Sequence, residues 1–224
     1  AVVISSEAGM GKSRLLYEFR KSIANDDVFF YEGKCLSYSR STAYHPIIDV
    51  LKSYFRIVEG EPDSAIREKV TTGLDVLSID ADRTLPCLLE LLSVKDSGID
   101  QEMMGPEARR ERINDTLSRM VIKAARLRPM VLAIEDLHWI DPPSRELLEE
   151  VIAPAFDSIP GMFVLTFRDD YPFVKLLEHA ETLIDLNRLD RANARLMMLR
   201  QLQADTVPPV LEEFIMQRSE GNPF

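Results

Sequence analysis

The opening sixteen residues, AVVISSEAGMGKSRLL, constrain the fold of this chain more than any other stretch. Residues 1–4 are small or apolar and predict a short buried strand, while Lys12 begins a segment with helical spacing. The loop between them, residues 5–11, contains two glycines that allow the backbone to curl tightly. A strand, a glycine-containing loop and a helix in this order predict a phosphate-binding loop.

The residue types in this loop suit that chemistry. Backbone N–H groups and the N-terminus of the following helix face the phosphate oxygens in such a loop. The Lys12 ammonium reaches the terminal phosphates, and the Ser13 hydroxyl can ligate Mg²⁺. We therefore expect the nucleotide to be bound by Ser6, Glu7, Ala8, Gly9, Met10, Gly11, Lys12, Ser13 and Arg14.

One position departs from the pattern G-x-x-x-x-G-K-[ST]. Ser6 stands where the first glycine is expected, whereas Gly11 occupies the second glycine position. Serine is disfavoured at positive φ, so the departure predicts a cost in loop stability or in nucleotide affinity.

Length and composition predict one globular domain and part of a second. The 224 residues are 46% hydrophobic and 29% charged, and they contain no run of eighteen apolar residues. No signal peptide is visible, and Cys35 and Cys87 lack metal-binding spacing, so we expect a cytoplasmic protein without membrane association and with reduced thiols. The net charge of −10 argues against direct binding of nucleic acid by this domain.

The hydrophobic pattern predicts an α/β fold with a five-stranded parallel sheet. After the first strand, apolar runs predict strands at residues 28–33, 130–134, 162–167 and 182–186, and strands alternate with helices in the last hundred residues. We expect a three-layer P-loop domain over residues 1–188, with its first strand beside both the third and the fourth. A helical insertion is predicted at about 46–105, and the helices near 191–203 and 209–219 begin a truncated helical lid over 189–224.

Two acids, Glu135 and Asp136, end the third predicted strand. Carboxylates at the carboxyl end of a strand, in a chain with a phosphate-binding loop, are typical of nucleotide hydrolysis. Strand position favours Glu135, together with Ser13, for Mg²⁺, and Asp136 for orienting and deprotonating the attacking water. The order Glu-Asp, in place of the usual Asp first, leaves the rate of hydrolysis open.

The segment VLAIEDLHWIDPPSRELL, residues 131–148, resembles the Walker B region of AAA/STAND-type P-loop ATPase modules. SEAGMGKSRLL is similar to the Walker A loop of the same family. Shorter resemblances lie at residues 33–35 and 44–46, at LTFR (165–168) and at EGNPF (220–224). Such modules occur in large bacterial signalling proteins, notably multidomain class III adenylate/guanylate cyclases and MalT-like transcription regulators.

The resemblance implies roles for two further residues. Arg168 would be the sensor-1 residue, which joins Glu135 and Asp136 in catalysis by responding to loss of the γ-phosphate. An alternative for Arg168 is an ion pair with the acids at positions 169 and 170. Pro223 would pack near the adenine.

Other residues of the family signature have structural interpretations. Trp139 is expected to pack in the core, and Asp141 to cap the next helix. His45 and His138 are expected to be structural, because neither has further ligands at metal-binding spacing.

Together these features predict a Mg-ATP-binding regulatory ATPase module with slow turnover, coupled to an attached signalling output domain. The alternative is a scaffold or switch that binds ATP or ADP without hydrolysing it. A small-molecule phosphotransferase is less favoured because no arginine-rich lid is found, and a DNA-remodelling motor because the chain is acidic. Expected partners are ATP or ADP and covalently attached effector and sensor domains outside this sequence; self-association and the preference for adenine over guanine stay open.

Overall fold

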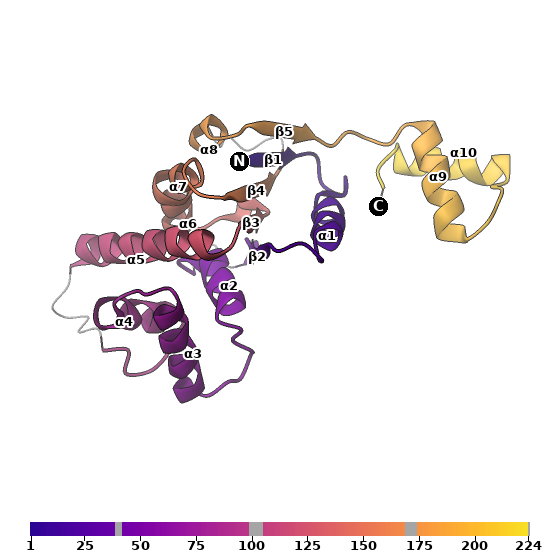
Figure 1. Cartoon of the computed structure of the whole chain (residues 1–224). Helices are drawn as coiled ribbons and strands as arrows, with labels where there is room; N and C mark the ends of the chain where they lie inside the picture. The colour runs from indigo at the N-terminus through magenta and orange to yellow at the C-terminus, as the bar shows by residue number, and fades with distance from the viewer. Residues whose placement is uncertain (39–41, 99–104, 169–173, 224) are drawn as a thin grey trace.

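The computed structural model describes residues 1–38, 42–98, 105–168 and 174–223. A five-stranded parallel sheet lies at its centre, as Figure 1 shows, and confirms the predicted α/β class. The strands are β1 (Val2–Ser5), β2 (Phe29–Lys34), β3 (Met130–Glu135), β4 (Gly161–Phe167) and β5 (Thr182–Asp185).

The strand order is β2-β3-β4-β1-β5, which corrects one expectation. β1 pairs with β4, with Val3 opposite Leu165, and β4 separates β1 from β3. A hydrophobic pattern identifies strands but not their order, because helical crossovers let a later strand enter between two earlier ones. The carboxyl ends of β1, β4 and β3 still lie side by side at one edge of the sheet.

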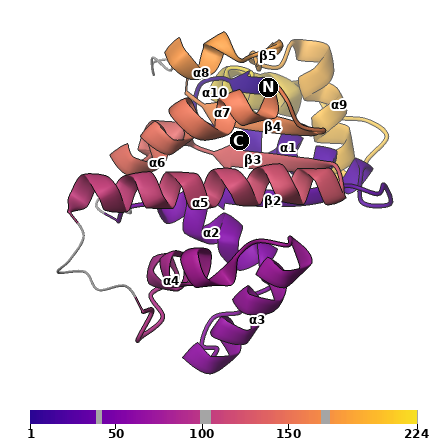
Figure 2. The ribbon, with the colours of Figure 1, turned by 60° about the vertical axis from the view of Figure 1, so that its left-hand side comes forward.

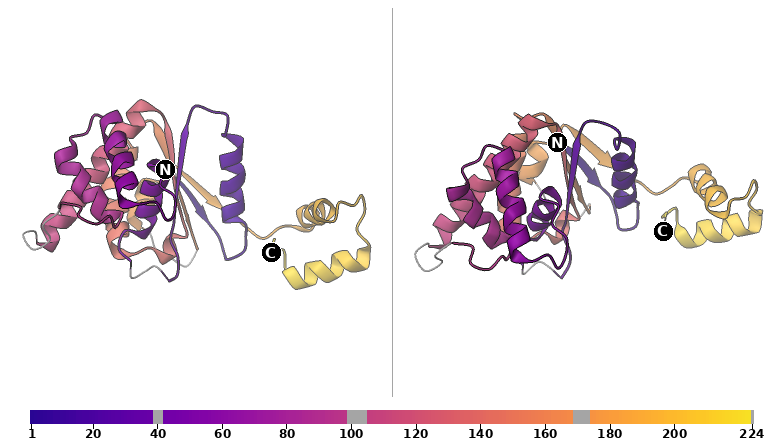
Figure 3. Two further views of the ribbon diagram at one scale, coloured as in Figure 1. Left: turned by 90° about the horizontal axis from the view of Figure 1, so that it is seen from below. Right: turned by 60° about the horizontal axis from the view of Figure 1, so that its bottom comes forward.

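Helices cover both faces of the sheet and give the predicted three layers (Figure 3). On one face lies α1 (Lys12–Ser22), whose Leu16 packs against Val131 and Ala133 of β3. On the other face lie α2 (His45–Tyr54), α5 (Pro106–Leu127) and the continuous run α6 (Pro142–Leu147), η2 (Leu148–Ile152) and α7 (Ala153–Phe156). All six residues of β3 are buried, as expected for a parallel strand covered on both faces.

The predicted helical block forms α3 (Asp63–Val76) and α4 (Ala81–Leu91), which lie beyond α2 and α5 in Figure 2. Their buried residues Val70, Leu74 and Leu88 belong to the same core cluster as the sheet face. The helical pair therefore shares its core with the sheet. No helix in the described ranges is long and apolar enough to cross a membrane.

After α8 (Val174–Glu178) and β5, the chain leaves the sheet and forms α9 (Arg191–Leu202) and α10 (Pro209–Ser219). These two helices stand apart from the three layers in Figures 1 and 3. They share a small core of their own, formed by Ala194, Met198 and Val207. The pair matches the predicted start of a helical lid in position and in helix bounds, while the domain boundary itself stays a prediction.

A close approach between α2 and the sheet gives the first testable prediction. A Cβ atom on Gly33 of β2 would lie 2.3 Å from the Pro46 carbonyl oxygen. The substitution Gly33→Ala should therefore destabilise the chain by about 1–3 kcal/mol, the usual range for overpacking. Gly105→Ala is the matched control, because Gly105 has open space around its Cβ position and a φ of −63°. Denaturant unfolding curves measure both, and equal stability of the two variants would contradict the packing described.

Candidate functional site

The loop from β1 to α1 has the geometry of a phosphate cradle. Gly9 and Gly11 have φ values of 81° and 98°, in the left-handed region that favours glycine. Gly11 is the residue before the first turn of α1, and its carbonyl accepts a hydrogen bond from the Leu15 N–H at 2.9 Å. The remaining N–H groups of this first turn are available to an anion, as at other helix N-termini.

The Lys12 ammonium lies folded over this loop. Its Nζ donates to the Ser6 carbonyl at 2.8 Å, to the Ser6 Oγ at 2.9 Å and to the Glu7 carbonyl at 3.0 Å. Lys12 is only 8% exposed, so its ammonium is held inside the loop. An incoming phosphate would offer the ammonium a charged acceptor, which makes a stronger hydrogen bond than a carbonyl does.

Ser6 carries no backbone penalty, which corrects the expectation drawn from the sequence. It is not among the described residues with positive φ. Its side chain is fully buried, and its Oγ donates to the Glu7 carbonyl at 3.0 Å while accepting from Lys12. The serine therefore adds an oxygen that positions Lys12, which a glycine cannot supply.

The two acids of the candidate site follow one another at the carboxyl end of β3. The Glu135 side chain is 4% exposed, and the Ser13 hydroxyl at the start of α1 lies close enough to help lower its pKa. This contact joins the two residues predicted to hold Mg²⁺. Ser13 follows β1 and Glu135 ends β3. The two residues lie close together although β4 separates these strands.

Asp136 has an unusual backbone, with a φ of 56°. Aspartate tolerates the left-handed conformation better than most residues, but the conformation still needs support. Its N–H donates to the Thr166 Oγ1 at 3.0 Å, and its carbonyl accepts from the Trp139 N–H at 2.8 Å. Thr166, buried on β4, thereby fixes the backbone position from which the Asp136 side chain extends. Sequence reasoning missed the role of Thr166.

Sequence reasoning also missed a lysine beside Glu135. Lys34 ends β2 directly opposite Glu135 in the strand register. Its Nζ lies 3.0 Å from Glu135 Oε1 and 3.0 Å from Glu32 Oε1, so one ammonium bridges two carboxylates. Glu32 and Lys34 alternate on one strand and therefore share a face. That alternation was the available signal, but the pairing of β2 with β3 had to be known first.

The three groups shift one another's pKa values. Burial alone would raise the pKa of Glu135, but hydrogen bonds from Glu32, Ser13 and Lys34, together with the Lys34 charge, hold it below its usual value. Burial and the hydrogen bond to Glu135 raise the pKa of Glu32, against the opposing effect of Lys34. Glu135 is therefore the more acidic member of the pair and stays ionised at neutral pH.

Arg168 follows β4, the strand between β3 and β1. Its guanidinium lies over the Trp139 ring, 6.0 Å from the ring centroid. Trp139 itself packs against the main core cluster, as predicted. The alternative pairing of Arg168 with the acids at 169 and 170 lies outside the described residues.

Asp141 caps α6, and this prediction is confirmed. Its Oδ1 accepts from the Ser144 N–H at 2.9 Å and also from the Tyr44 N–H at 2.9 Å, just before α2. The buried carboxylate therefore ties the segment after the Walker B strand to the segment after β2. His45 has a structural contact too, since its Nδ1 lies 3.2 Å from the Lys34 carbonyl oxygen.

The end of the chain returns to the phosphate-binding loop. Asn222 donates from its side chain to the Ala8 carbonyl at 3.2 Å. Arg188, before α9, pairs with Glu7 of the loop at 3.1 Å and with Glu220 at 2.7 Å. These contacts connect both ends of the α9–α10 pair to the loop.

An open groove of about 840 Å³ lies between the loop, α1 and α9. Pro223, Arg14 and Met10 line it, and so do apolar residues from the connection and from α9: Leu186, Leu189, Leu196 and Met197. The groove adjoins the phosphate-binding loop, since Gly9, Met10 and Gly11 also line it. Of the predicted nucleotide-binding residues, Gly9, Met10, Gly11, Arg14 and Pro223 line this groove, and the others belong to the loop or to the start of α1.

The residues present fit ATP and Mg²⁺. Gly9 and Gly11 shape a cradle for phosphate, and Ser13 with Glu135 offers the hydroxyl and carboxylate oxygens that Mg²⁺ prefers. No group of three His, Cys, Asp or Glu side chains that could hold a metal occurs in the described part of the chain.

A parallel sheet with this loop and these acids at one edge defines a P-loop nucleotide-binding protein. The family model described as "AAA ATPase domain" matches residues 1–164, and the chain belongs to that family. A curated relative, "Uncharacterized protein R02095" of Rhizobium meliloti (strain 1021), is 31% identical over 199 residues, covering 87% of this chain and 19% of the relative. The chain thus spans about a fifth of the length of that relative.

Two solved structures are more distantly similar. The Aeropyrum pernix ORC1 protein in complex with DNA has a TM-score of 0.47 and 10% identity, covering 98% of this chain and 48% of that one. A HORMA:CdnC:Trip13 complex of E. coli MS115-1 has a TM-score of 0.40 and 9% identity, covering 93% of this chain and 68% of that one. Likenesses this loose carry no argument about function.

The position of Lys34 gives a prediction about metal binding. Its ammonium competes with a metal ion for Glu135, so Lys34→Met should tighten Mn²⁺ binding in the presence of saturating ADP. The gain should be about two- to fivefold, because the lysine is largely exposed and exposed ion pairs contribute at most about 1 kcal/mol. Lys21→Met, an exposed lysine in the last turn of α1, is the control. The electron spin resonance signal of free Mn²⁺ measures the affinity, and unchanged or weaker binding in Lys34→Met would contradict the competition.

Proposed function

We propose that the chain is a regulatory ATPase module that binds Mg-ATP and couples its nucleotide state to an attached output domain. The observation that carries the proposal is the closeness of the Ser13 hydroxyl and the buried Glu135 carboxylate beside the phosphate cradle. A loop that only connects a strand to a helix would not require a buried carboxylate, here Glu135, beside it. The family membership supports the nucleotide-binding part of the proposal.

In the proposed mechanism, each group of the chain has one task. The loop N–H groups and Lys12 bind the phosphates, and Ser13 and Glu135 hold Mg²⁺, which supplies charge neutralisation at the phosphate oxygens. Asp136, held by Thr166, orients the attacking water and accepts its proton. Arg168 responds to the charge on the terminal phosphate from the tip of β4.

Coupling to an output domain would use the α9–α10 pair. Glu7, an exposed residue of the phosphate-binding loop, shares Arg188 with Glu220. Phosphate arriving at the loop brings negative charge beside Glu7 and so changes the balance between these two ion pairs. Movement of α9 and α10 relative to the sheet would then report the nucleotide state to any domain that follows.

A non-hydrolysing scaffold is the second candidate, and specific contacts favour it. Lys34 already neutralises Glu135, and the backbone of Asp136 holds a left-handed conformation. The Lys34 contact works against binding of Mg²⁺ by Glu135 and leaves the phosphate cradle intact. The two candidates therefore agree on nucleotide binding and differ in whether phosphate is released.

Nucleotide binding is tested at Lys12. Lys12→Ala should weaken Mg-ATP binding about ten- to hundredfold, since hydrogen bonds to charged groups contribute about 1.5–3 kcal/mol. Lys21→Ala removes the same charge from the far end of α1 and should leave the affinity unchanged. Isothermal titration calorimetry measures the affinity, and a thermal melt of each variant checks folding. A folded Lys12→Ala variant with the affinity of the unaltered chain would refute the site.

A further inference from the structure

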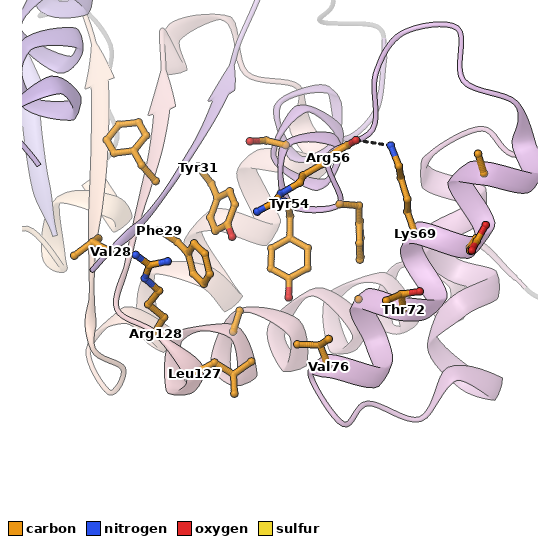
Figure 4. A pocket seen from close by; sticks show the side chains of 17 residues that line it. Val28, Phe29, Tyr31, Tyr54, Arg56, Lys69, Thr72, Val76, Leu127 and Arg128 are labelled. Atoms are coloured by element: carbon orange, nitrogen blue, oxygen red, sulfur yellow. Dashed lines mark hydrogen bonds between the residues drawn. The ribbon is translucent and has the colours of Figure 1, made fainter. Parts of the chain in front are cut away.

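A second cleft, remote from the phosphate-binding loop, lies between the start of β2 and the helix α3 (Figure 4). Its volume is about 990 Å³. The walls come from β2, the end of α2 with the turn after it, α3 and the end of α5. None of the residues in the proposed ATPase mechanism lines it.

The cleft reaches the edge of β2. Residues Val28 to Tyr31 all line it, although side chains on one face of a strand alternate. A cleft over one face of the sheet would contact only every second residue of the strand. Because four consecutive residues line this cleft, it opens onto the edge of β2. β2 is the last strand of the sheet, and among the described residues no strand pairs with its outer edge.

Unused backbone hydrogen-bonding groups lie along this edge. The Phe29 N–H donates to the Pro129 carbonyl at 2.9 Å, and the Cys35 N–H donates to the Glu135 backbone carbonyl at 3.0 Å. Both hydrogen bonds point toward β3. Strand residues alternate in the direction of their backbone groups, so those of Phe30 and Glu32 point away from β3. Among the described residues, neither has a backbone hydrogen bond on that outer side. Such an edge is a template for one more strand.

The lining of the cleft carries three cations, Arg56, Lys69 and Arg128, and one acid, Glu68. Arg128 stacks on the Phe29 ring at 4.6 Å and pairs with Asp27. Lys69 binds Glu61 and the Arg56 carbonyl. The Arg56 guanidinium, which extends between Tyr31 and Tyr54 in Figure 4, has no carboxylate partner among the described residues.

The phenol of Tyr31 adds a neutral donor beside this guanidinium. Burial, together with the neighbouring Tyr54, raises the pKa of Tyr31 to about 12, so its hydroxyl keeps its proton at neutral pH. An arginine and a protonated phenol side by side suit a carboxylate, which accepts hydrogen bonds from both.

We propose that this cleft binds an extended acidic peptide segment, which adds to β2 as a sixth strand and places a carboxylate on Arg56. The open backbone groups of Phe30 and Glu32 supply main-chain pairing, and the cleft supplies a pocket for side chains on one face. A nucleic acid would match the cations but has no backbone amides to pair with the strand edge. The edge therefore favours a peptide.

The test uses the whole chain and two labelled octapeptides, one alternating Val and Glu and one alternating Val and Lys. Fluorescence anisotropy should show saturable binding of the Glu peptide and at least about tenfold weaker binding of the Lys peptide. Arg56→Glu should weaken binding of the Glu peptide about tenfold, while Lys21→Glu, a charge reversal on the opposite face of the sheet, should leave it unchanged. Neither variant should alter Mg-ATP affinity, which confirms that the chain is folded.

Hydrogen exchange on the unaltered chain gives an independent readout. Binding of the Glu peptide should slow exchange of the Phe30 and Glu32 amides, which point outward, more than exchange of the Phe29 and Tyr31 amides, which already pair with β3. Absence of saturable binding, insensitivity to Arg56→Glu or unchanged exchange at Phe30 and Glu32 would each overturn the proposal. Concentration-dependent self-association that Arg56→Glu abolishes would also overturn it, because the occupant would then be a second copy of the chain.

Discussion

The parallel direction of all five strands is the constraint on which the candidate site depends. Because β1, β4 and β3 run the same way, their carboxyl ends meet at one edge and bring the phosphate-binding loop, Arg168 and the two acids together. An antiparallel neighbour would have placed one of these groups at the opposite edge. Burial of β3 on both faces stabilises this arrangement, since each face carries its own apolar cluster.

Within this frame, the charged groups of the site are already satisfied by the chain itself. Lys12 is held by oxygens of Ser6 and Glu7, and Glu135 by Lys34. Binding of Mg-ATP therefore requires Lys12 and Glu135 to exchange these internal partners for phosphate oxygens and Mg²⁺. Such an exchange keeps the net gain modest, which suits a module that responds to nucleotide and does not hold it permanently.

Local pattern was enough to predict the strands, the loop, the paired acids and the Asp141 cap, because each depends on residues close in sequence. The order of β1 and β3 was wrong, since pairing between distant strands leaves no local signature. The expected backbone penalty at Ser6 was wrong as well, because Ser6 does not adopt the positive φ that would have disfavoured a serine. Thr166, Lys34 and the cleft beside β2 were missed for the same reason: each acquires its role only when separate strands become neighbours.

Phosphate release from Mg-ATP by the chain, measured beside the Asp136→Asn variant, tests the central claim most directly. The account predicts slow release by the unaltered chain and a loss of at least about a hundredfold in the variant, the lower range for removal of a general base. Mg-ATP binding should be preserved in the variant, because an asparagine side chain has the size of the acid and leaves its backbone contacts in place. Equal release by both proteins would contradict the role of Asp136, and tight binding without release by either would show that the chain is a nucleotide-held scaffold.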